Sequence, residues 1–384
     1  MTLSEYSSAA RRDIAEAIED RLFASGTSCA GFSGDSGRIF SVMKDYILSG
    51  KMLRGILACL SSELFSAGIE ESALRRKKAL GLAAALEFFQ AGLLVHDDIM
   101  DKDEMRRGKP TMHKTFERIE AAQLRGPAGA DPCAANLGAA DPDTADLGAA
   151  ELGAAGLGEA IGICAGDIYY FIAWQLISYL GQEIGKLFSR ELVDVCLAQI
   201  KDVRLGSRRE IPVLEETIEV YTYKTARYTI CLPLCAGALV AGRADAIPAL
   251  EALGLNLGIL FQLQDDYLGL FGDEEELGKP VGSDIREGKK TPFMILLTQA
   301  LEDTEKPGFY RIFGNQDITR QDVDHVRSLV RAHGIDTQVR ALSAAYARKA
   351  EQCLAELSRH TAGLDSEKLG ILQEFIDYSL SRKF

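Results

Sequence analysis

The chain has 384 residues, of which 47% are hydrophobic and 26% are charged, the composition of a globular protein. Its formal net charge of −13 argues against nucleic acid as a general partner, because a phosphate backbone requires a basic surface. The eight cysteines lack zinc-like spacing, which favours small core residues in a reducing compartment. Residues 1–23 lack the apolar core of a signal peptide, and the longest apolar stretch, residues 230–242, is too short to span a bilayer. We therefore expect a cytoplasmic protein without a transmembrane segment.

Helical periodicity dominates the chain, and the alternating patterns of strands are essentially absent. The pattern predicts helices over residues 4–23, 39–47, 55–65, 77–95, 159–180, 190–203, 218–241, 246–268, 292–300, 320–332, 335–357 and 366–381. Residues 121–158 differ, because they are rich in Gly, Ala, Asp and Pro and contain no aromatic residue. Such a tract cannot bury enough surface to order itself. We expect one all-α domain over residues 1–384 with a mobile insertion at about 121–158.

Two aspartate clusters stand out, each after an apolar helical run. Asp97, Asp98 and Asp101 follow residues 83–95, and Asp265 and Asp266 follow residues 253–263. Carboxylates four residues apart project from one face of a helix, where like charges are destabilising unless a partner offsets them. A hard divalent cation with oxygen ligands does so, and magnesium commonly takes phosphate oxygens as further ligands. The two clusters suggest a metal–diphosphate site.

The alternative is a pair of solvated acidic turns, the better default for one isolated cluster. Residues 88–95 are uncharged, which suits a buried wall more than an exposed face. Basic residues also follow both clusters, namely Arg106, Arg107 and Lys109 after the first and Lys279, Lys289 and Lys290 after the second. Acidic beside basic residues at both places favour a metal with an anionic ligand.

The motifs resemble those of the trans-isoprenyl diphosphate synthases, which make polyprenyl diphosphates by head-to-tail condensation. The resemblance rests on HDDIMDKDEMRRGKPTMHK (96–114), AGD (165–167), YKTARYT (223–229) and FQLQDDYLGLFGDEEELGKPVGSDIREGKKT (261–291), with the early Lys51 and Arg54. It covers most of the chain outside the insertion. It implies a helix bundle around a central cavity, usually in a homodimer, and three magnesium ions around the allylic diphosphate between facing aspartate motifs.

The resemblance also implies roles for single residues. Direct metal ligands would be Asp97, Asp101 and Asp265, supported by Asp98 and Asp266. The allylic diphosphate would be held by Arg106, Lys224 and Lys279, and isopentenyl diphosphate by Lys51, Arg54 and Arg107. Thr225 and Gln262 would place polar groups near the developing carbocation, so the residues closest to the chemistry would be Lys224, Thr225 and Gln262.

Four positions depart from the family pattern. Gly55 replaces a proline after Arg54, which could loosen the isopentenyl loop. Gln90 replaces a histidine and can still donate to phosphate through its amide. Ser207 replaces a glutamine near Arg208 and Arg209. Gly269 replaces the fifth residue of the second aspartate motif, while the expected ligand, the first aspartate, is present.

Product length in this family depends on residues four and five positions before the first aspartate, which are Leu93 and Gly92. Gly92 is expected to open the wall, and Phe89, about 12 Å from Asp97 along a helix, to form a floor that favours geranylgeranyl over farnesyl diphosphate. Phe89 packing against a neighbouring helix is the alternative. A farnesyl or longer-chain synthase, a terpene cyclase and a non-catalytic regulatory subunit are the other functions considered. Lys51, Arg54 and the second aspartate cluster argue against a cyclase, and the retained aspartates argue against a silent subunit.

Overall fold

The computed structural model describes residues 1–28, 36–65, 73–124, 142–208, 210–272 and 282–381, and it confirms the predicted all-α fold. The helices of the first half are α1 (Leu3–Ser28), α2 (Ser36–Leu48), α3 (Leu53–Leu64), α4 (Ala73–Met100), α5 (Met112–Leu124), α6 (Pro142–Ser178) and α7 (Gln182–Ser207). Those of the second half are α8 (Leu214–Val220), the π-helix η1 (Tyr221–Cys231), α9 (Leu232–Val240), the 3₁₀-helix η2 (Ala244–Ala246), α10 (Ile247–Phe271), α12 (Ser283–Arg286), α13 (Pro292–Ala300), α14 (Lys306–Ile312), α15 (Arg320–Ala332), α16 (Ile335–His360) and α17 (Ser366–Ser381). The strands β1 (Met105–Arg106) and β2 (Lys109–Pro110) form a short antiparallel hairpin that the sequence analysis did not predict.

The described chain divides into two compact units. The larger unit comprises Met1–Ala17, Lys51–Leu86 and Leu176–Phe384, and the smaller unit comprises Ile18–Gly50 and Glu87–Gln175. The first aspartate motif belongs to the smaller unit and the second to the larger unit. Each unit is built from separate stretches of the chain. The expectation of a single domain stays a prediction.

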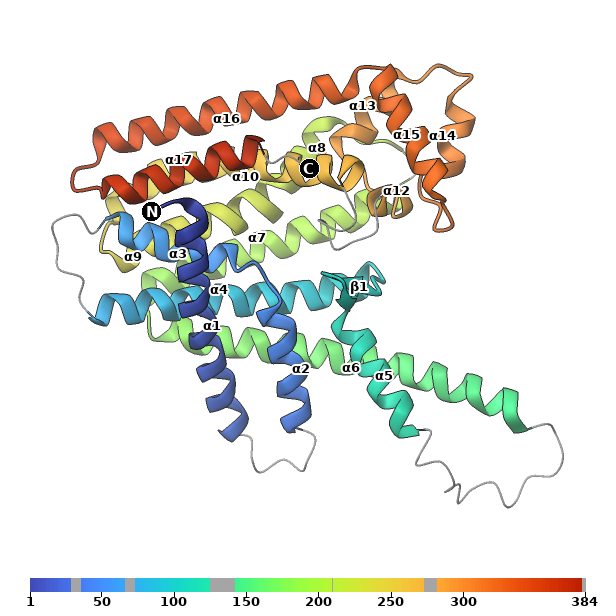
Figure 1. Cartoon of the computed structure of the whole chain (residues 1–384), viewed down its shortest axis with the longest axis horizontal. Coiled ribbons are helices and arrows are strands. Elements are labelled where there is room, and N and C mark those ends of the chain that lie inside the picture. Colours follow the sequence, from blue (N-terminus) through green and yellow to red (C-terminus); the bar gives the residue numbers. More distant parts are fainter. Residues whose placement is uncertain (29–35, 66–72, 125–141, 209, 273–281, 382–384) are drawn as a thin grey trace. The chain divides into compact units, whose positions relative to one another are not determined.

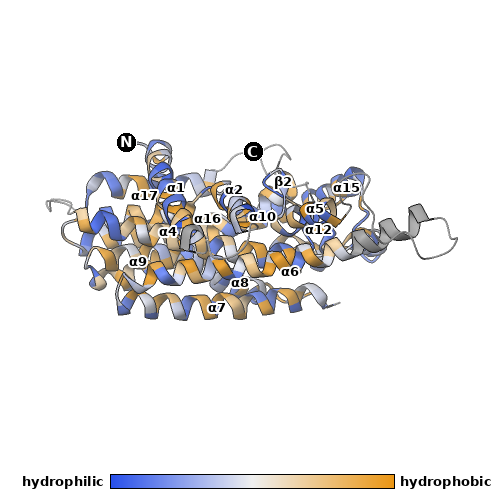
Figure 2. Cartoon of the chain, turned by 90° about the horizontal axis from the view of Figure 1, so that it is seen from below, coloured by the Kyte–Doolittle hydropathy of each residue, from blue (hydrophilic) through white to orange (hydrophobic). Residues whose placement is uncertain are grey.

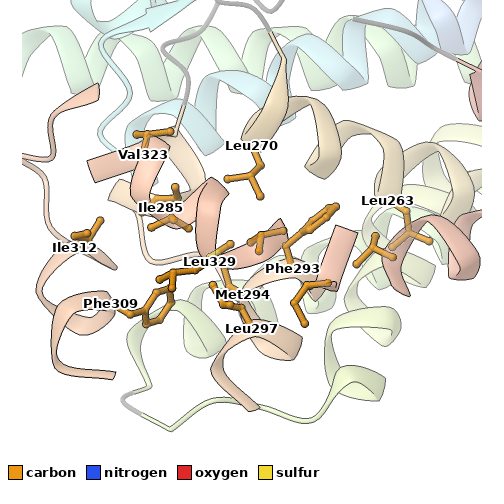
Figure 3. Packing of buried hydrophobic residues seen from close by; sticks show 14 of the residues in the cluster. Leu263, Leu270, Ile285, Phe293, Met294, Leu297, Phe309, Ile312, Val323 and Leu329 are labelled. Atoms are coloured by element: carbon orange, nitrogen blue, oxygen red, sulfur yellow. The ribbon is translucent and has the colours of Figure 1, made fainter. Parts of the chain in front are cut away.

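In the larger unit, α10 packs against η1 and α16, and α3 packs against α9 (Figure 1). A cluster of buried apolar side chains connects the C-terminal part of α10 with α12, α13, α14 and α15 (Figure 3). Leu270 of α10, Ile285 of α12 and Phe293 of α13 belong to this cluster. The apolar core therefore fixes the end of α10, which carries the second aspartate motif.

In the smaller unit, glycines allow α6 to approach two other helices closely. A Cβ atom at Gly92 of α4 would lie 2.6 Å from the Tyr170 ring, and one at Gly158 of α6 would lie 2.6 Å from the carbonyl oxygen of His113 in α5. Both distances are far shorter than an ordinary contact, so only glycine fits without movement. This packing fixes the end of α4, which carries the first aspartate motif.

The predicted insertion at 121–158 is partly wrong. Residues 121–124 end α5, and α6 begins at Pro142 instead of residue 159. Residues 125–141 lie outside the described residues. The C-terminal part of the tract is helical because it is rich in alanine and leucine, which favour helix and extend α6.

Three described helical stretches are long and apolar enough to cross a membrane when length and composition alone are considered: Ala73–Met100, Gly153–Ser178 and Ala244–Phe271. Between 39% and 67% of their most apolar windows is buried inside the protein. Two of these stretches end in the aspartate motifs. Their apolar residues are partly buried in the packed core. The expected absence of a transmembrane segment and the cytoplasmic location stay predictions.

Candidate active site

The first aspartate motif occupies the last turn of α4 and the residue after it. Asp98 is fully buried, and its Oδ2 accepts a hydrogen bond of 2.8 Å from the Tyr46 hydroxyl of α2. Its Oδ1 accepts a hydrogen bond from Arg106 Nε of the hairpin. Asp97 and Asp101, one turn apart, are only half-buried. The motif therefore combines one carboxylate fixed inside the unit with two that remain accessible.

Charge supports this arrangement at Asp98. Burial lowers the pKa of Arg106 and the Asp98 carboxylate raises it, with a net shift upward, so Arg106 stays protonated. Burial raises the pKa of Asp98 above its ordinary value, and the Arg106 charge opposes that shift. Burial and the same carboxylate raise the pKa of Tyr46, so its hydroxyl stays protonated and donates. Arg106 also reaches Asp103 at 3.4 Å. Arg106 therefore has a structural role within the motif, and its role with the allylic diphosphate stays a prediction.

The hairpin after the motif is a tight turn at Arg107 and Gly108. Both residues have positive φ, 53° and 71°, as a two-residue type I′ turn requires. The turn brings Arg107 Nη1 to 3.2 Å from Ser49 Oγ. A Cβ atom at Gly50 would lie 3.2 Å from the same nitrogen, so glycine leaves room for the guanidinium. Arg107 thus lies beside the Ser49–Gly50 loop that precedes Lys51 in sequence.

One face of α4 packs against α6. Gly166 of the AGD motif makes room for His96, because a Cβ there would lie 2.5 Å from Nε2 of the imidazole. His96 also lies 3.2 Å from the Ile163 carbonyl oxygen and 3.4 Å from the Tyr170 hydroxyl. These contacts explain the glycine of the motif and give His96 a packing role between α4 and α6.

The residues predicted to set product length lie on two faces of α4. Phe89 is buried with its ring edge-on to Trp174 of α6, at 5.4 Å between centroids. The space beside Gly92 is filled by Tyr170, so the expectation that Gly92 opens a wall is wrong: this glycine serves close packing. Leu93 is half-buried, as are Gln90 and Asp97 on the same side of the helix. The floor formed by Phe89 stays a prediction.

The second aspartate motif lies in the last two turns of α10. Asp266 is 6% exposed, and its Oδ2 accepts a hydrogen bond from the Tyr221 hydroxyl of η1. Its Oδ1 accepts 3.0 Å from Gln262 Nε2, and Gln262 Oε1 accepts 2.8 Å from the Thr225 hydroxyl. Asp265, next to it, is half-buried. The structure thus brings together the predicted residues Thr225, Gln262 and Asp266.

Gly269, the departure at the fifth position of this motif, has a local explanation. A Cβ atom there would lie 2.8 Å from Asp284 Oδ2, so the missing side chain leaves space for a carboxylate from α12. Burial first, and Asp284 next, raise the pKa of Asp266 to about 8. Asp284 therefore brings negative charge to the second motif that Gly269 itself does not provide.

The π-helix η1 carries the YKTARYT motif. Lys224 Nζ lies 2.8 Å from Asp202 Oδ2 of α7, and Arg54 of α3 donates to Thr229 Oγ1 at 2.5 Å. The Arg54 guanidinium also lies 4.6 Å from the centre of the Tyr228 ring. π-Helical turns are rare in proteins, and those that occur often lie at functional sites. Lys224 therefore belongs to η1, and Arg54 contacts η1 through Thr229 and Tyr228. Both residues are expected to bind diphosphate.

Gly55 does not loosen the segment that carries Arg54. It is buried in the first turn of α3, where a Cβ would lie 3.0 Å from Ile14 Cδ1 and 3.2 Å from the Ala83 carbonyl oxygen. The glycine therefore allows α3 to pack closely against α1 and α4. Lys51, just before α3, is exposed, whereas Lys279 lies outside the described residues.

Sequence reasoning missed Tyr46, Tyr221 and Asp202. Each is far from its partner in sequence, and neither tyrosine belongs to a recognisable motif. No local pattern could have identified the two tyrosines, because their function depends on which helices pack together.

The donor atoms fit magnesium that is bound together with a diphosphate. Within the described ranges, no three His, Cys, Asp or Glu side chains form a group that could hold a metal ion alone. Magnesium requires only one or two carboxylates when phosphate oxygens and waters complete its shell. The half-buried Asp97, Asp101 and Asp265 can provide such oxygens, while Asp98 and Asp266 are held by their own partners.

Comparison with known proteins identifies the family. Residues 38–124 and 151–330 match the family model described as polyprenyl synthetase. The geranylgeranyl diphosphate synthase of Saccharolobus solfataricus is 31% identical over 76% of this chain and 75% of that protein. The geranylfarnesyl diphosphate synthase of Aeropyrum pernix is 26% identical over 87% of this chain and 90% of that protein. The crystal structure of geranylgeranyl pyrophosphate synthase from Corynebacterium glutamicum, complexed with isoprenyl diphosphate and magnesium, has a TM-score of 0.82 at 26% identity, with 100% of both chains covered.

The chain belongs to the polyprenyl synthetase family, as its motifs predicted. It is a prenyltransferase with the all-α fold of its structural neighbours.

Proposed function

We propose that this protein condenses isopentenyl diphosphate with an allylic diphosphate, with magnesium, to give all-trans geranylgeranyl diphosphate. The observation that carries the proposal is shared by both aspartate motifs. In each, a buried aspartate is fixed by hydrogen bonds and its neighbour remains half-buried. This is the arrangement expected of carboxylates that receive a metal from outside the protein core.

We propose Asp97, Asp101 and Asp265 as direct metal ligands, around three magnesium ions that share one diphosphate. Asp98 and Asp266 support them. Bound magnesium would stabilise the negative charge that develops on the leaving diphosphate. Magnesium is also the metal in the related Corynebacterium complex.

The cations divide between the two substrates. Arg106, Lys224 and Lys279 are proposed to hold the allylic diphosphate, and Lys51, Arg54 and Arg107 isopentenyl diphosphate. Arginine makes bidentate contacts with phosphate, whereas lysine acts as a point charge. The 3.2 Å contact of Arg107 with Ser49 supports a shared anion site with the adjacent Gly50–Lys51 segment.

No side-chain nucleophile is required. The bond between the allylic carbon and diphosphate breaks first and leaves an allylic cation. The isopentenyl double bond then attacks this cation, and the departing diphosphate accepts the proton that is lost. Thr225 and Gln262 are proposed to stabilise the cation through their oxygens. Their mutual hydrogen bond of 2.8 Å and the contact of Gln262 with Asp266 fix both side chains beside the second motif.

The product assignment rests on the relatives and on α4. The Saccharolobus and Corynebacterium proteins are geranylgeranyl synthases by name, whereas the Aeropyrum protein is a geranylfarnesyl synthase. Leu93 is half-buried on the same side of α4 as Asp97, and of the predicted length-determining residues it is the nearest to Asp97 in sequence. A farnesyl or longer product remains the alternative that the assay below distinguishes.

We propose a homodimer because α7 exposes hydrophobic side chains. Hydrophobic and hydrophilic residues both occur along this helix (Figure 2). Val193, Leu197, Ile200 and Val203 recur at helical spacing and are 48–59% exposed. A second copy would cover this stripe. Light scattering of Leu197→Glu should show a monomer where the wild type is a dimer; a monomeric wild type would contradict the proposal.

The activity test is incubation of the pure protein with isopentenyl diphosphate and each of dimethylallyl, geranyl and farnesyl diphosphates, with and without magnesium, followed by sizing of the products. We expect geranylgeranyl diphosphate and no product without the metal. Asp97→Ala or Asp265→Ala should abolish turnover without unfolding the protein. Asp303→Ala, whose side chain is 97% exposed, is the matched control. Full activity in either motif variant would contradict the metal assignment.

A further inference from the structure

We infer that Tyr46 and Tyr221 are positioning residues for the two metal-binding motifs. Each tyrosine fixes the buried second aspartate of its motif and thereby presents the first aspartate to the metal. The inference rests on the proposed function, because it assigns the half-buried aspartates to magnesium.

The first case lies in the smaller unit. Tyr46 belongs to α2 and donates to Asp98 Oδ2 at 2.8 Å, while Arg106 donates to Oδ1. The backbone continues the anchoring, because Asp98 O accepts from Asp103 N at 2.9 Å where α4 ends. Both oxygens and the carbonyl of Asp98 are therefore held, and the helix cannot rotate about its axis at this point without losing buried hydrogen bonds.

The second case lies in the larger unit and repeats the same design with different residues. The Tyr221 hydroxyl, at the start of η1, donates to Asp266 Oδ2, and Gln262 Nε2 donates to Oδ1 at 3.0 Å. Asp266 and Tyr221 are both buried. Two unrelated pairs of helices thus use a tyrosine hydroxyl on the second aspartate of a motif.

Helix geometry connects this anchoring to the metal. Successive residues of an α-helix point about 100° apart, so a fixed second aspartate sets the direction of the first. Asp97 and Asp265 are the half-buried neighbours whose direction is set. Residues that orient the groups around a metal ligand commonly affect metal affinity by about 10–100-fold when they are removed.

The two tyrosines should differ in importance. Asp98 keeps a charge-assisted hydrogen bond from Arg106 when Tyr46 is changed, and such bonds are roughly twice as strong as neutral ones. Among the described residues, the hydrogen bond that Asp266 keeps when Tyr221 is changed comes from the neutral amide of Gln262. The loss of Tyr221 should therefore have the larger effect.

The test compares Tyr46→Phe and Tyr221→Phe with Tyr169→Phe. Tyr169 is a matched control because its hydroxyl is also buried and hydrogen-bonded, but to the backbone oxygen of Met43 and not to an aspartate. Phenylalanine retains the ring in all three, so each variant loses one hydroxyl. A purely structural role would lower the melting temperature in all three alike.

The first readout is calorimetric titration of magnesium into the protein with inorganic pyrophosphate present. We expect the apparent Kd for magnesium to rise about 10-fold or more in Tyr221→Phe, by a smaller factor in Tyr46→Phe, and not at all in Tyr169→Phe. The second readout is the magnesium concentration for half-maximal turnover, which should rise in the same order, with kcat largely recovered at saturating magnesium.

Unchanged affinity in Tyr46→Phe and Tyr221→Phe, or an equal change in Tyr169→Phe, would overturn the inference. If Tyr221→Phe does not fold, the comparison of Tyr46→Phe with Tyr169→Phe decides. If the wild-type protein forms prenyl product and the tyrosine variants bind magnesium as tightly as it does, only the role of the tyrosines is contradicted. A wild-type protein that forms no product contradicts the proposed function itself.

Discussion

Replacement of Gly92 by alanine tests whether the helix that carries the first aspartate motif depends on close packing against α6. A methyl group there would lie 2.6 Å from Tyr170 Cε1 and 2.9 Å from the Gly166 carbonyl oxygen. Carbon atoms prefer about 3.5–4.0 Å, so the overlap approaches 1 Å. Neither neighbour can move easily, because one is backbone and the Tyr170 ring packs against His96 at 5.4 Å between centroids. Overpacking of this kind costs about 1–3 kcal/mol.

Gly81 of the same helix is the matched control, because a Cβ there would have nothing within 4 Å. Both replacements gain about 1 kcal/mol of helix propensity, so the difference between them isolates the overlap. We expect Gly81→Ala to be stabilised and Gly92→Ala to be about 1–3 kcal/mol less stable than Gly81→Ala in guanidinium denaturation. Equal stability of the two variants would refute the close packing and restore the interpretation that Gly92 opens a wall.

Three further outcomes are expected. Because the pKa of Asp266 is about 8 in the folded chain, above its ordinary 3.8, the fold binds an extra proton between those values. Stability of the metal-free protein should therefore fall as pH rises from about 4 to 8, by at most about 1.4 kcal/mol per unit, and Asp266→Asn should lack this decline in thermal unfolding. Phe89→Ala should lengthen the product in a radiolabelled assay, and an unchanged distribution would exclude the floor. Gly269→Asp should lower turnover, because its carboxylate would meet Asp284; faster turnover would contradict this reading.

Sequence predicted the helices best where local chemistry defines their ends. The predicted spans 292–300 and 320–332 coincide with α13 and α15. Pro292 begins α13 with a preset backbone angle, and Thr319 and Asp322 form a capping box at the start of α15. These signals lie within four residues of the boundary, so they can be recognised without knowledge of the fold.

Sequence failed where long-range packing decides. Nothing local indicates that residues 221–231 form a π-helix or that α6 begins at Pro142. The hydroxyls of Tyr46 and Tyr221 reach aspartates 52 and 45 residues away, which only the packing of helices can bring about. The aspartates themselves were recognisable from their spacing, but the division into buried and half-buried members was not.

The most direct test of the account is a crystal structure of the protein with manganese in place of magnesium and a thio analogue of the allylic diphosphate that cannot ionise. Anomalous scattering would locate every metal ion. We predict metals bonded to Asp97 and Asp101 and to Asp265, all sharing oxygens of one diphosphate. Metals bound at one motif alone, or a diphosphate that contacts neither motif through a metal, would contradict the account.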